Sequence, residues 1–399
     1  MQICRLAVAA VLASPLFAQS LTGLWDATIK VNDVEIPFRM EFSGTGPAIQ
    51  ATFFNGDEKT TSTSGKFENG AVVARFEYYN SRLEATWKDG HLSGAYLRDG
   101  KTYPFEARRF APSKLTENDV PSIAGLWVVG VQSSKGESAW RMVVRQSGPE
   151  VSAAVLRVDG DTGMLTGTYH DGKFVLSHFS GARPSLFEVT PQKDGTLQIV
   201  QNGKNQMTAV RSTEARAKGM PEPTDPSRHT SMKDPTERFH FRFPDVNGRM
   251  VSDEDARFRG KVVIVAIGGS WCPNCHDEAP FLEELYRTYR SRGLEIVGLS
   301  FEEADQLKNP TRLAAFIKRY GIEYPVLLCG ETEELQAKLP QAVNLNAWPT
   351  TFFLGRDGRV RSVHAGFAGR ATGDFHRELK EEEKALVERL LAENGTQAQ

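Results

Sequence analysis

Short runs in which apolar and polar residues nearly alternate fill the first half of the chain. Residues 25–29, 39–42, 72–76 and 83–87 are examples. A period of two is typical of β-strands with one face in a core and one face in solvent. Asn-Gly and Asp-Gly pairs separate the runs and supply the positive φ angles that tight hairpins need. These pairs stand at residues 69–70, 89–90, 99–100, 171–172 and 194–195. The pattern predicts antiparallel β-structure.

This half of the chain also repeats itself at an offset of 102 residues, which indicates a duplicated unit. We expect two similar antiparallel β modules, sandwich-like or barrel-like, over residues 20–111 and 122–212. Their tryptophans fit the cores of small sheets, and their isolated histidines have no partner at metal-ligand or triad spacing. The matching positions are Gly23 and Gly125, Trp25 and Trp127, Met40 and Met142, Gly46 and Gly148, and Arg109 and Arg211.

The pattern changes after residue 212. Residues 213–237 hold four prolines among small and charged residues, a composition that cannot bury a core and predicts a linker. Downstream, continuous apolar runs alternate with runs of helical spacing, which predicts an α/β domain with a partly parallel sheet over residues 238–395. Strands are expected at 262–267, 294–299, 324–328 and 350–354, and helices at 278–289, 313–320 and 374–391.

The N-terminus has the composition of a secretory signal peptide. Arg5 precedes a short apolar run at residues 6–17, and Ala18 stands at the expected cleavage position. Such a run is too short to cross a membrane, which takes about 20 residues. We therefore expect residues 1–18 to be removed and the protein to be periplasmic or secreted. No later run approaches the length of a membrane span, so none is expected after cleavage.

Composition and charge narrow the function classes. Lys and Arg number 48 against 50 Asp and Glu, which leaves a formal charge of −2. This balance offers no electrostatic basis for binding nucleic acid or an anionic membrane surface. Four cysteines in 399 residues are too few for a disulfide framework. Because Cys4 precedes the expected cleavage site, the mature chain keeps Cys272, Cys275 and Cys329.

Cys272 and Cys275 stand between an expected buried strand and the helix that follows it. Pro273 suits the first turn of a helix, where its missing N–H leaves no hydrogen bond unmade. A thiolate at a helix N-terminus is stabilised by unpaired N–H groups and the helix dipole, which lowers the pKa of the thiol. We therefore expect Cys272 to be the nucleophile and Cys275 to resolve a mixed disulfide. No metal and no cofactor beyond this redox-active disulfide is expected.

Other functions compete for the same chain. Residues 272–276 also spell Cys-x-x-Cys-His, the attachment sequence of c-type haem, which would make the protein an electron carrier. A structural disulfide is a further alternative, whereas zinc lacks a second Cys or His pair at ligand spacing. A peroxidatic cysteine would need proline and a hydroxyl residue where Val265 and Gly269 stand. Alternatively, the β modules carry the main function, as an envelope binding protein.

Residues 238–395 resemble the exported thiol-disulfide oxidoreductases of the TlpA/ResA type in the thioredoxin superfamily. The resemblance rests first on the pattern W-C-x-x-C-x-x-E-x-P, which runs from Trp271 to Pro280. It rests also on Ala-Trp-Pro-Thr followed by an apolar strand at residues 347–354. It implies a thioredoxin-like fold and activity as a thiol-disulfide oxidoreductase.

The resemblance also implies roles for single residues. The bond between Trp348 and Pro349 is expected to be cis and to face the cysteine pair, with the Trp348 backbone pairing with an extended client strand. Trp271 is expected to contact the client, and Glu278 to tune proton movement near the cysteines. The implied partners are protein clients with thiols or disulfides, and a membrane or periplasmic thiol redox partner.

Two features are left open by the resemblance. Many family members carry proline immediately before the second cysteine, whereas here Pro273 follows the first and Asn274 precedes the second. The dipeptide between the cysteines affects the reduction potential, so either direction of exchange is compatible with the sequence. Cys329 follows the strand expected at residues 324–328. We interpret it as a small buried side chain, with an auxiliary thiol as the alternative.

Overall fold

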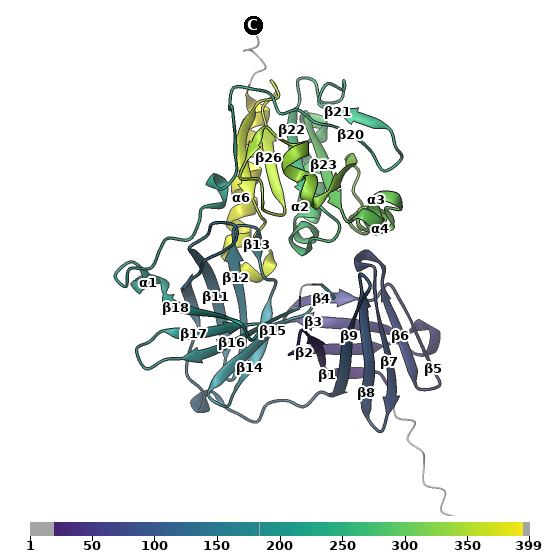
Figure 1. The fold of residues 1–399 in the computed structure, drawn as a ribbon, viewed down its shortest axis with the longest axis vertical. Helices are drawn as coiled ribbons and strands as arrows, with labels where there is room; N and C mark the ends of the chain where they lie inside the picture. The colour runs from purple at the N-terminus through teal and green to yellow at the C-terminus, as the bar shows by residue number, and fades with distance from the viewer. Residues whose placement is uncertain (1–19, 183, 394–399) are drawn as a thin grey trace, which may run out of the picture.

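The computed structural model describes residues 20–182 and 184–393, so the expected signal peptide lies outside the described residues. The chain forms three parts (Figure 1). The purple first β module and the teal second β module lie next to each other in the lower half of the view, and the green and yellow C-terminal domain lies above both. The C-terminal domain therefore sits over the junction of the two modules.

The first β module is an antiparallel sheet of nine strands in the order β4-β3-β2-β1-β9-β8-β7-β6-β5. Every second side chain of β1, namely Trp25, Ala27 and Ile29, is buried in its core. Aromatic rings fill much of this core, and those of Phe53 and Phe76 stack at 4.7 Å. The strands are β1 Gly23–Val31, β2 Val34–Ser43, β3 Gln50–Asn55, β4 Glu58–Thr61, β5 Ser64–Glu68, β6 Ala71–Phe76, β7 Ser81–Lys88, β8 His91–Arg98 and β9 Lys101–Arg109.

The second β module is an antiparallel sheet in the order β11-β10-β18-β17-β16-β15-β14-β12-β13. Because β11 also pairs with β12, this sheet closes into a barrel. Its core has a separate set of apolar side chains, among them Trp127 and Phe174. The strands are β10 Gly125–Gly130, β11 Ala139–Ser147, β12 Glu150–Arg157, β13 Gly160–Asp161, β14 Leu165–His170, β15 Lys173–His178, β16 Ser185–Pro191, β17 Leu197–Gln201 and β18 Asn205–Arg211.

The two modules repeat the same packing at equivalent positions. The indole N–H of Trp25 and that of Trp127 each donate to the carbonyl oxygen four residues earlier, both at 2.9 Å. The guanidinium of Arg109 lies 4.2 Å from the ring centroid of Trp25, and that of Arg211 lies 4.1 Å from that of Trp127. The duplication predicted from the offset in sequence is therefore a duplication of structure.

The segment expected to be a linker contacts the second module and then the C-terminal domain. The short helix α1 (Ser212–Ala215) follows β18 directly and packs beside β10. Further on, β19 (Ser231–Met232) pairs with β25 (Ala342–Val343). The chain therefore runs along the C-terminal domain before the main sheet of that domain begins.

The C-terminal domain is built on a five-stranded sheet in the order β24-β23-β22-β26-β27. Strands β22, β23 and β24 are parallel, whereas β26 and β27 are antiparallel to their neighbours. Helices α2, α4 and α6 share a core with one face of the sheet, and the segment with β20 and β21 packs with the other. The expected fold class, two β modules and a thioredoxin-like α/β domain, is confirmed. The elements are β20 Arg242–Pro244, β21 Met250–Ser252, β22 Val262–Gly268, β23 Leu294–Glu302, β24 Val326–Glu331, β26 Thr350–Leu354, β27 Val360–Ala365, α2 Pro273–Tyr289, α3 Ala304–Lys308, α4 Thr311–Tyr320, α5 Leu335–Lys338 and α6 Asp374–Ala392.

Helix α6 is the longest helix among the residues that the structure describes. Helix α6 has 19 residues but carries a run of charged side chains at residues 380–384. Within residues 20–182 and 184–393, no helix combines the length and the apolar composition that crossing a bilayer requires.

Candidate active site

Cys272 and Cys275 lie at the junction of β22 and α2. Residues 269–271 follow β22, and Cys272 is the N-cap residue of α2, with Pro273 in the first helical turn. The backbone N–H of Cys275 donates to Sγ of Cys272 at 3.3 Å. N–H groups at a helix N-terminus lack partners within the helix and stabilise a thiolate placed there. The structure therefore places the sulfur of Cys272 at the N-terminus of α2, within reach of a helix N–H group.

The two sulfur atoms are both buried but have different surroundings. Cys272 is 0% exposed and Cys275 is 6% exposed. Burial raises the pKa of the Cys275 thiol well above its usual value, and its hydrogen bond with Cys272 and the nearby charge of Glu278 raise it further. A sulfur that accepts a helix N–H beside a thiol that keeps its proton suits stepwise thiol-disulfide exchange.

A buried ion pair that no sequence motif marks supports the turn before Cys272. Glu302, the last residue of β23, accepts hydrogen bonds from the N–H and the hydroxyl of Ser270, both at 2.7 Å. Arg312 of α4 donates to the same carboxylate at 2.9 Å and to the Ser270 hydroxyl at 2.8 Å. The Glu302 and Arg312 side chains are 0% and 1% exposed. In the sequence, this ion pair is indicated only by the charge of Glu302 at the end of an apolar strand.

Glu278 lies one helical turn after Cys275, and its carboxyl group is buried. The hydroxyl of Thr351 on β26 donates to its Oε1 at 2.6 Å. Burial raises the pKa of Glu278 to about 7, and the Thr351 hydrogen bond acts in the opposite direction. A cavity of about 50 Å³ has Cys275, Glu278 and Tyr324 among its lining residues. Glu278 therefore changes its charge near neutral pH beside a cavity that it shares with Cys275.

The loop before β26 approaches the cysteine pair through two tryptophans. The bond between Trp348 and Pro349 is cis. The indole rings of Trp271 and Trp348 meet edge to face with their centroids 5.4 Å apart, and Trp271 Nε1 donates to the carbonyl oxygen of Phe301 at 2.9 Å. Both indoles are only partly buried. The structure thus brings Trp271, which precedes Cys272, into contact with Trp348, which precedes the cis-proline.

His276, the histidine of the Cys-x-x-Cys-His sequence, is held inside the domain. Its Nδ1 is 2.9 Å from the hydroxyl of Tyr320, and its Nε2 is 2.9 Å from the carbonyl oxygen of Ser270. Burial lowers the pKa of His276 to about 3. An axial haem ligand needs a ring nitrogen that can reach iron. With both nitrogens hydrogen-bonded and both cysteines buried, these residues do not fit an attached haem.

Cys329 lies on β24 and is 4% exposed. Its side chain packs with Val265 and Leu299 on the sheet face opposite α2, whereas Cys275 belongs to α2. Burial raises the pKa of the Cys329 thiol well above its usual value. The sheet therefore lies between Cys329 and the cysteine pair, which favours the role of a small buried side chain over that of an auxiliary thiol.

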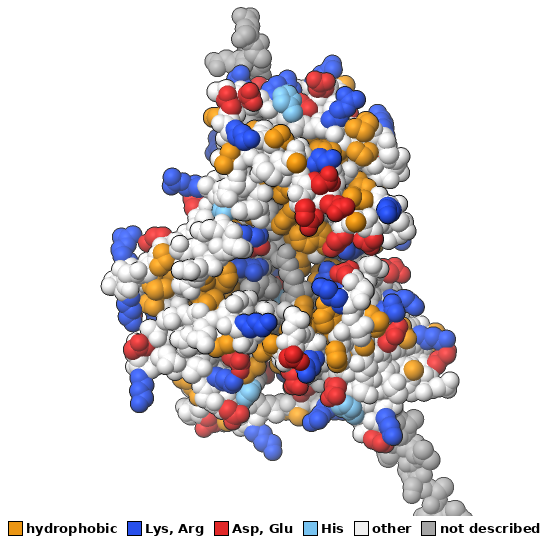
Figure 2. All heavy atoms as spheres, in the orientation of Figure 1, with side chains coloured by type: hydrophobic (Ala, Val, Ile, Leu, Met, Phe, Trp, Pro, Cys, Tyr) orange, Lys and Arg blue, Asp and Glu red, His pale blue; other side chains and the backbone are white. Residues whose placement is uncertain are grey.

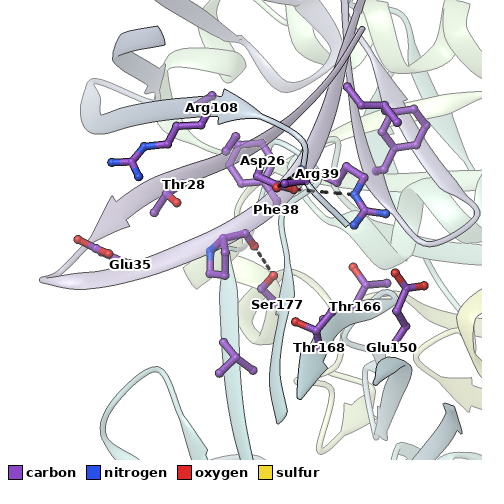
Figure 3. Close-up of a pocket in the computed structure, with 18 of the residues that line it drawn as sticks. Asp26, Thr28, Glu35, Phe38, Arg39, Arg108, Glu150, Thr166, Thr168 and Ser177 are labelled. Atoms are coloured by element: carbon purple, nitrogen blue, oxygen red, sulfur yellow. Dashed lines mark hydrogen bonds and ion pairs between the residues drawn. The ribbon is translucent and has the colours of Figure 1, made fainter. Parts of the chain in front are cut away.

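A large cleft lies between the outer faces of the two β modules, away from the cysteines. Its volume is about 1140 Å³. Figure 3 shows Asp26 and Arg39 of the first module and Thr166 and Thr168 of the second around this cleft. The hydroxyl of Ser177 in the second module donates a hydrogen bond to the carbonyl oxygen of Pro37 in the first. Charges of both signs line it. Among the described residues, no group of three or more His, Cys, Asp or Glu side chains could hold a metal ion.

Comparison with known proteins places the C-terminal domain among thiol-disulfide exchange proteins. The AhpC/TSA family model matches residues 236–363. The chain is 31% identical over 137 residues to the thiol-disulfide oxidoreductase ResA of Bacillus cereus (strain ATCC 10987 / NRS 248), a match that covers 34% of this chain and 70% of that protein. It is 30% identical over 127 residues to ResA of Bacillus subtilis (strain 168), where it covers 32% of this chain and 64% of that protein.

A solved structure with a similar domain is the thiol:disulfide interchange protein, a thioredoxin family protein, of Chlorobium tepidum TLS. It is 27% identical, has a TM-score of 0.31, and its match covers 41% of this chain and 100% of that chain. More than half of the present chain, including most of both β modules, therefore has no counterpart in these matches.

Proposed function

Because the chain belongs to the ResA family of thiol-disulfide oxidoreductases, we propose that Cys272 and Cys275 are its redox-active pair and that it exchanges disulfides with protein clients. One observation carries the assignment of roles. The sulfur of Cys272 accepts the Cys275 N–H at the start of α2, whereas burial keeps the proton on Cys275. Cys272 is thus the nucleophile and Cys275 the resolving thiol.

In the reducing direction, the Cys272 thiolate attacks one sulfur of a client disulfide. A bond forms between Cys272 and that sulfur, the client S–S bond breaks, and the leaving thiolate takes up a proton. Cys275 then loses its proton, for which Glu278 is the nearby acceptor, and attacks Cys272. This step forms the Cys272–Cys275 disulfide and releases the second client thiolate. The client gains two electrons and the cysteine pair loses two; the oxidising direction is the reverse.

The partners follow from this chemistry and from the surroundings of the pair. The partly exposed indoles of Trp271 and Trp348 offer an apolar contact for a client, and the family resemblance implies that the Trp348 backbone pairs with an extended client strand. Each reduction leaves the pair oxidised, so a membrane or periplasmic thiol partner must restore it. The signal-peptide pattern at residues 1–18 supports action in the periplasm or outside the cell.

Substitution of the resolving cysteine tests the proposed roles. In Cys275→Ser, attack by Cys272 survives but resolution does not, so the variant should accumulate mixed disulfides with a model protein client. The mixed disulfide is measured by non-reducing gel electrophoresis and peptide mapping. The matched Cys272→Ser variant should trap none. Equal trapping by both variants, or linkage through Cys275, would contradict the assignment.

The acidic residue of the site predicts a pH dependence. In the wild type, the rate of resolution should rise as pH increases through about 7, because only ionised Glu278 accepts the Cys275 proton. In Glu278→Gln this rise should disappear and the rate at pH 8 should fall by about tenfold or more. The measurement is the pH profile of single-turnover exchange, and an unchanged profile would exclude Glu278 as the acceptor.

The stability of the same variant gives an independent check of the Glu278 environment. In the folded chain the pKa of Glu278 is about 7, above its usual value of 4.5. The favourable contribution of Glu278 is therefore complete below pH 4.5 and is lost as pH rises through 7. Glu278→Gln should accordingly gain stability relative to the wild type between pH 5 and pH 8, by up to roughly 3 kcal/mol.

A further inference from the structure

The turn between β12 and β13 in the second β module lies directly against the Cys-x-x-Cys segment. The side-chain amide of Asn274, which stands between the two cysteines, donates to the carbonyl oxygen of Asp159 at 2.5 Å. Asn274 is 2% exposed. The contact joins residues 115 positions apart in the chain. The second module therefore reaches into the surface that surrounds the redox pair.

The same turn packs on the loops that flank the cysteine pair. Val158, Ala347 and Ala365 form one buried cluster, and Ala347 directly precedes Trp348 and the cis-proline. A Cβ at Gly366 would lie 2.2 Å from the backbone nitrogen of Gly160. The two backbones are thus in direct contact, and only glycine fits at position 366.

The described contacts leave Cys272 no exposed surface. Its exposed fraction is 0%, whereas attack on a client disulfide requires the client sulfur to reach Sγ of Cys272. Asn274 Nδ2 already donates to the second module, and the backbone N–H of Gly369 donates to the carboxylate of Asp161. An extended client backbone could accept hydrogen bonds from these donors only after the turn has left them.

The first β module contacts the neighbouring side of the same domain. The ring of Tyr79 lies 4.9 Å from that of His276, and Arg319 of α4 lies 3.9 Å from the ring centroid of Tyr78. Asp99 is 3.8 Å from the guanidinium of Arg312. In Figure 2, acidic side chains gather on the C-terminal domain just above its junction with the modules. Both modules therefore contact the C-terminal domain next to the cysteine pair.

Two carboxyl groups lie close together at the contact between the second module and the C-terminal domain, those of Asp161 and Asp277. A Cβ at Gly369 would lie 2.9 Å from Oδ2 of Asp161 and 3.1 Å from Oδ2 of Asp277, so the two carboxyl groups flank one point. Burial raises the pKa of Asp161 to about 6, and the nearby Glu58 raises it further, whereas hydrogen bonds from the backbone N–H groups of Gly163 and Gly369 and the charge of Arg157 act in the opposite direction. The backbone N–H of Gly369 thus binds a carboxylate of the second module beside a carboxylate of the C-terminal domain.

We propose that residues 157–163, which comprise the end of β12, the turn, β13 and the two residues after it, are a built-in cover that occupies the client surface of the redox pair. A client gains access to Cys272 only when this cover moves away from the C-terminal domain. The occupant that replaces the cover is an extended polypeptide segment carrying a disulfide, because the groups that become available are the Asn274 amide and the Gly369 backbone N–H. This inference rests on the proposed function of Cys272.

The test compares two single substitutions of valine in the second module of the full chain. Val158→Asp places a charge in the buried contact with Ala347 and Ala365. The matched control Val128→Asp places the same charge in a buried cluster of the second module that packs against α1. The reduced proteins are treated with a polyethylene glycol maleimide, and modification of Cys272 is followed by peptide mapping.

The cover predicts that Val158→Asp raises the rate of Cys272 modification at least tenfold, while Val128→Asp leaves it near the wild-type rate. If Val158→Asp does not fold, Val158→Ala should still give a smaller increase. Equal rates in all folded variants, or wild-type Cys272 modified as fast as cysteine in a short peptide, would overturn the cover.

A second measurement distinguishes failure of this inference from failure of the proposed function. It is the rate at which the wild type and Val158→Asp reduce a small aromatic disulfide. If Val158→Asp is modified rapidly but reduces no disulfide, the cover stands and the proposed function fails. If the wild type and Val158→Asp reduce the small disulfide equally and are modified equally, the function stands and the cover fails. If only the reduction of protein disulfides becomes faster in Val158→Asp, together with modification, both are supported.

Discussion

Replacing Cys272 with serine should lower the rate of disulfide exchange by about a thousandfold or more, because a serine hydroxyl does not ionise at neutral pH and cannot form a disulfide. The helix N-terminus that stabilises a thiolate at position 272 cannot compensate for that difference. The rate is measured with a reduced or oxidised model protein under single-turnover conditions. This loss is the largest effect on activity that we expect from any single substitution.

A second buried thiol in the same domain provides the control. Cys329 is 4% exposed and lies on the sheet face away from α2. Cys329→Ser therefore removes a thiol from the same domain without touching the pair, and exchange should stay within about twofold of the wild type. Exchange that survives in Cys272→Ser, or that is lost in Cys329→Ser, would show that the active thiol has been misassigned.

The largest effect on stability is expected for Arg312→Met. This substitution leaves the Glu302 carboxylate buried without its cation, and breaking a buried ion pair in this way costs about 3–5 kcal/mol. The hydrogen bond from Arg312 to the Ser270 hydroxyl is lost as well, so the turn before Cys272 should also become less ordered. The measurement is the free energy of unfolding from urea denaturation, followed by a probe in the C-terminal domain.

An exposed ion pair provides the matched comparison. Arg290 contacts Glu323 at 2.6 Å, but their side chains are 51% and 45% exposed. Arg290→Met should therefore change the free energy of unfolding by less than about 1 kcal/mol. If the two substitutions destabilise the protein equally, the buried network does not support the turn before Cys272 in the way the geometry indicates.

The pattern of apolar and polar residues was sufficient to predict the strands that position the candidate active site. The strand expected at residues 350–354 forms β26, Thr350–Leu354, and the one at 262–267 forms β22, Val262–Gly268. Helical spacing of apolar residues is visible only from residue 278, whereas the helix begins at Pro273, where the chemistry of helix ends places its first turn. Its start is set by a cap, through the N–H of Cys275 and the sulfur of Cys272, and caps leave no trace in hydrophobic periodicity. Strand β27 (Val360–Ala365) was not predicted, because its apolar residues at positions 360, 363 and 365 form neither an alternating nor a continuous run.

The sequence by itself determined the duplicated β modules, the order of the C-terminal elements and the position of Cys272 at a strand-to-helix junction. These features depend on side-chain periodicity, turn dipeptides and helix-end chemistry, which act between residues close in the chain. Only the tertiary structure decided that Glu302 and Arg312 support the turn before Cys272, that His276 is enclosed, and that a turn from the second module lies on Asn274. Burial and proton affinity depend on which distant segments pack around a group, and no local pattern records that packing.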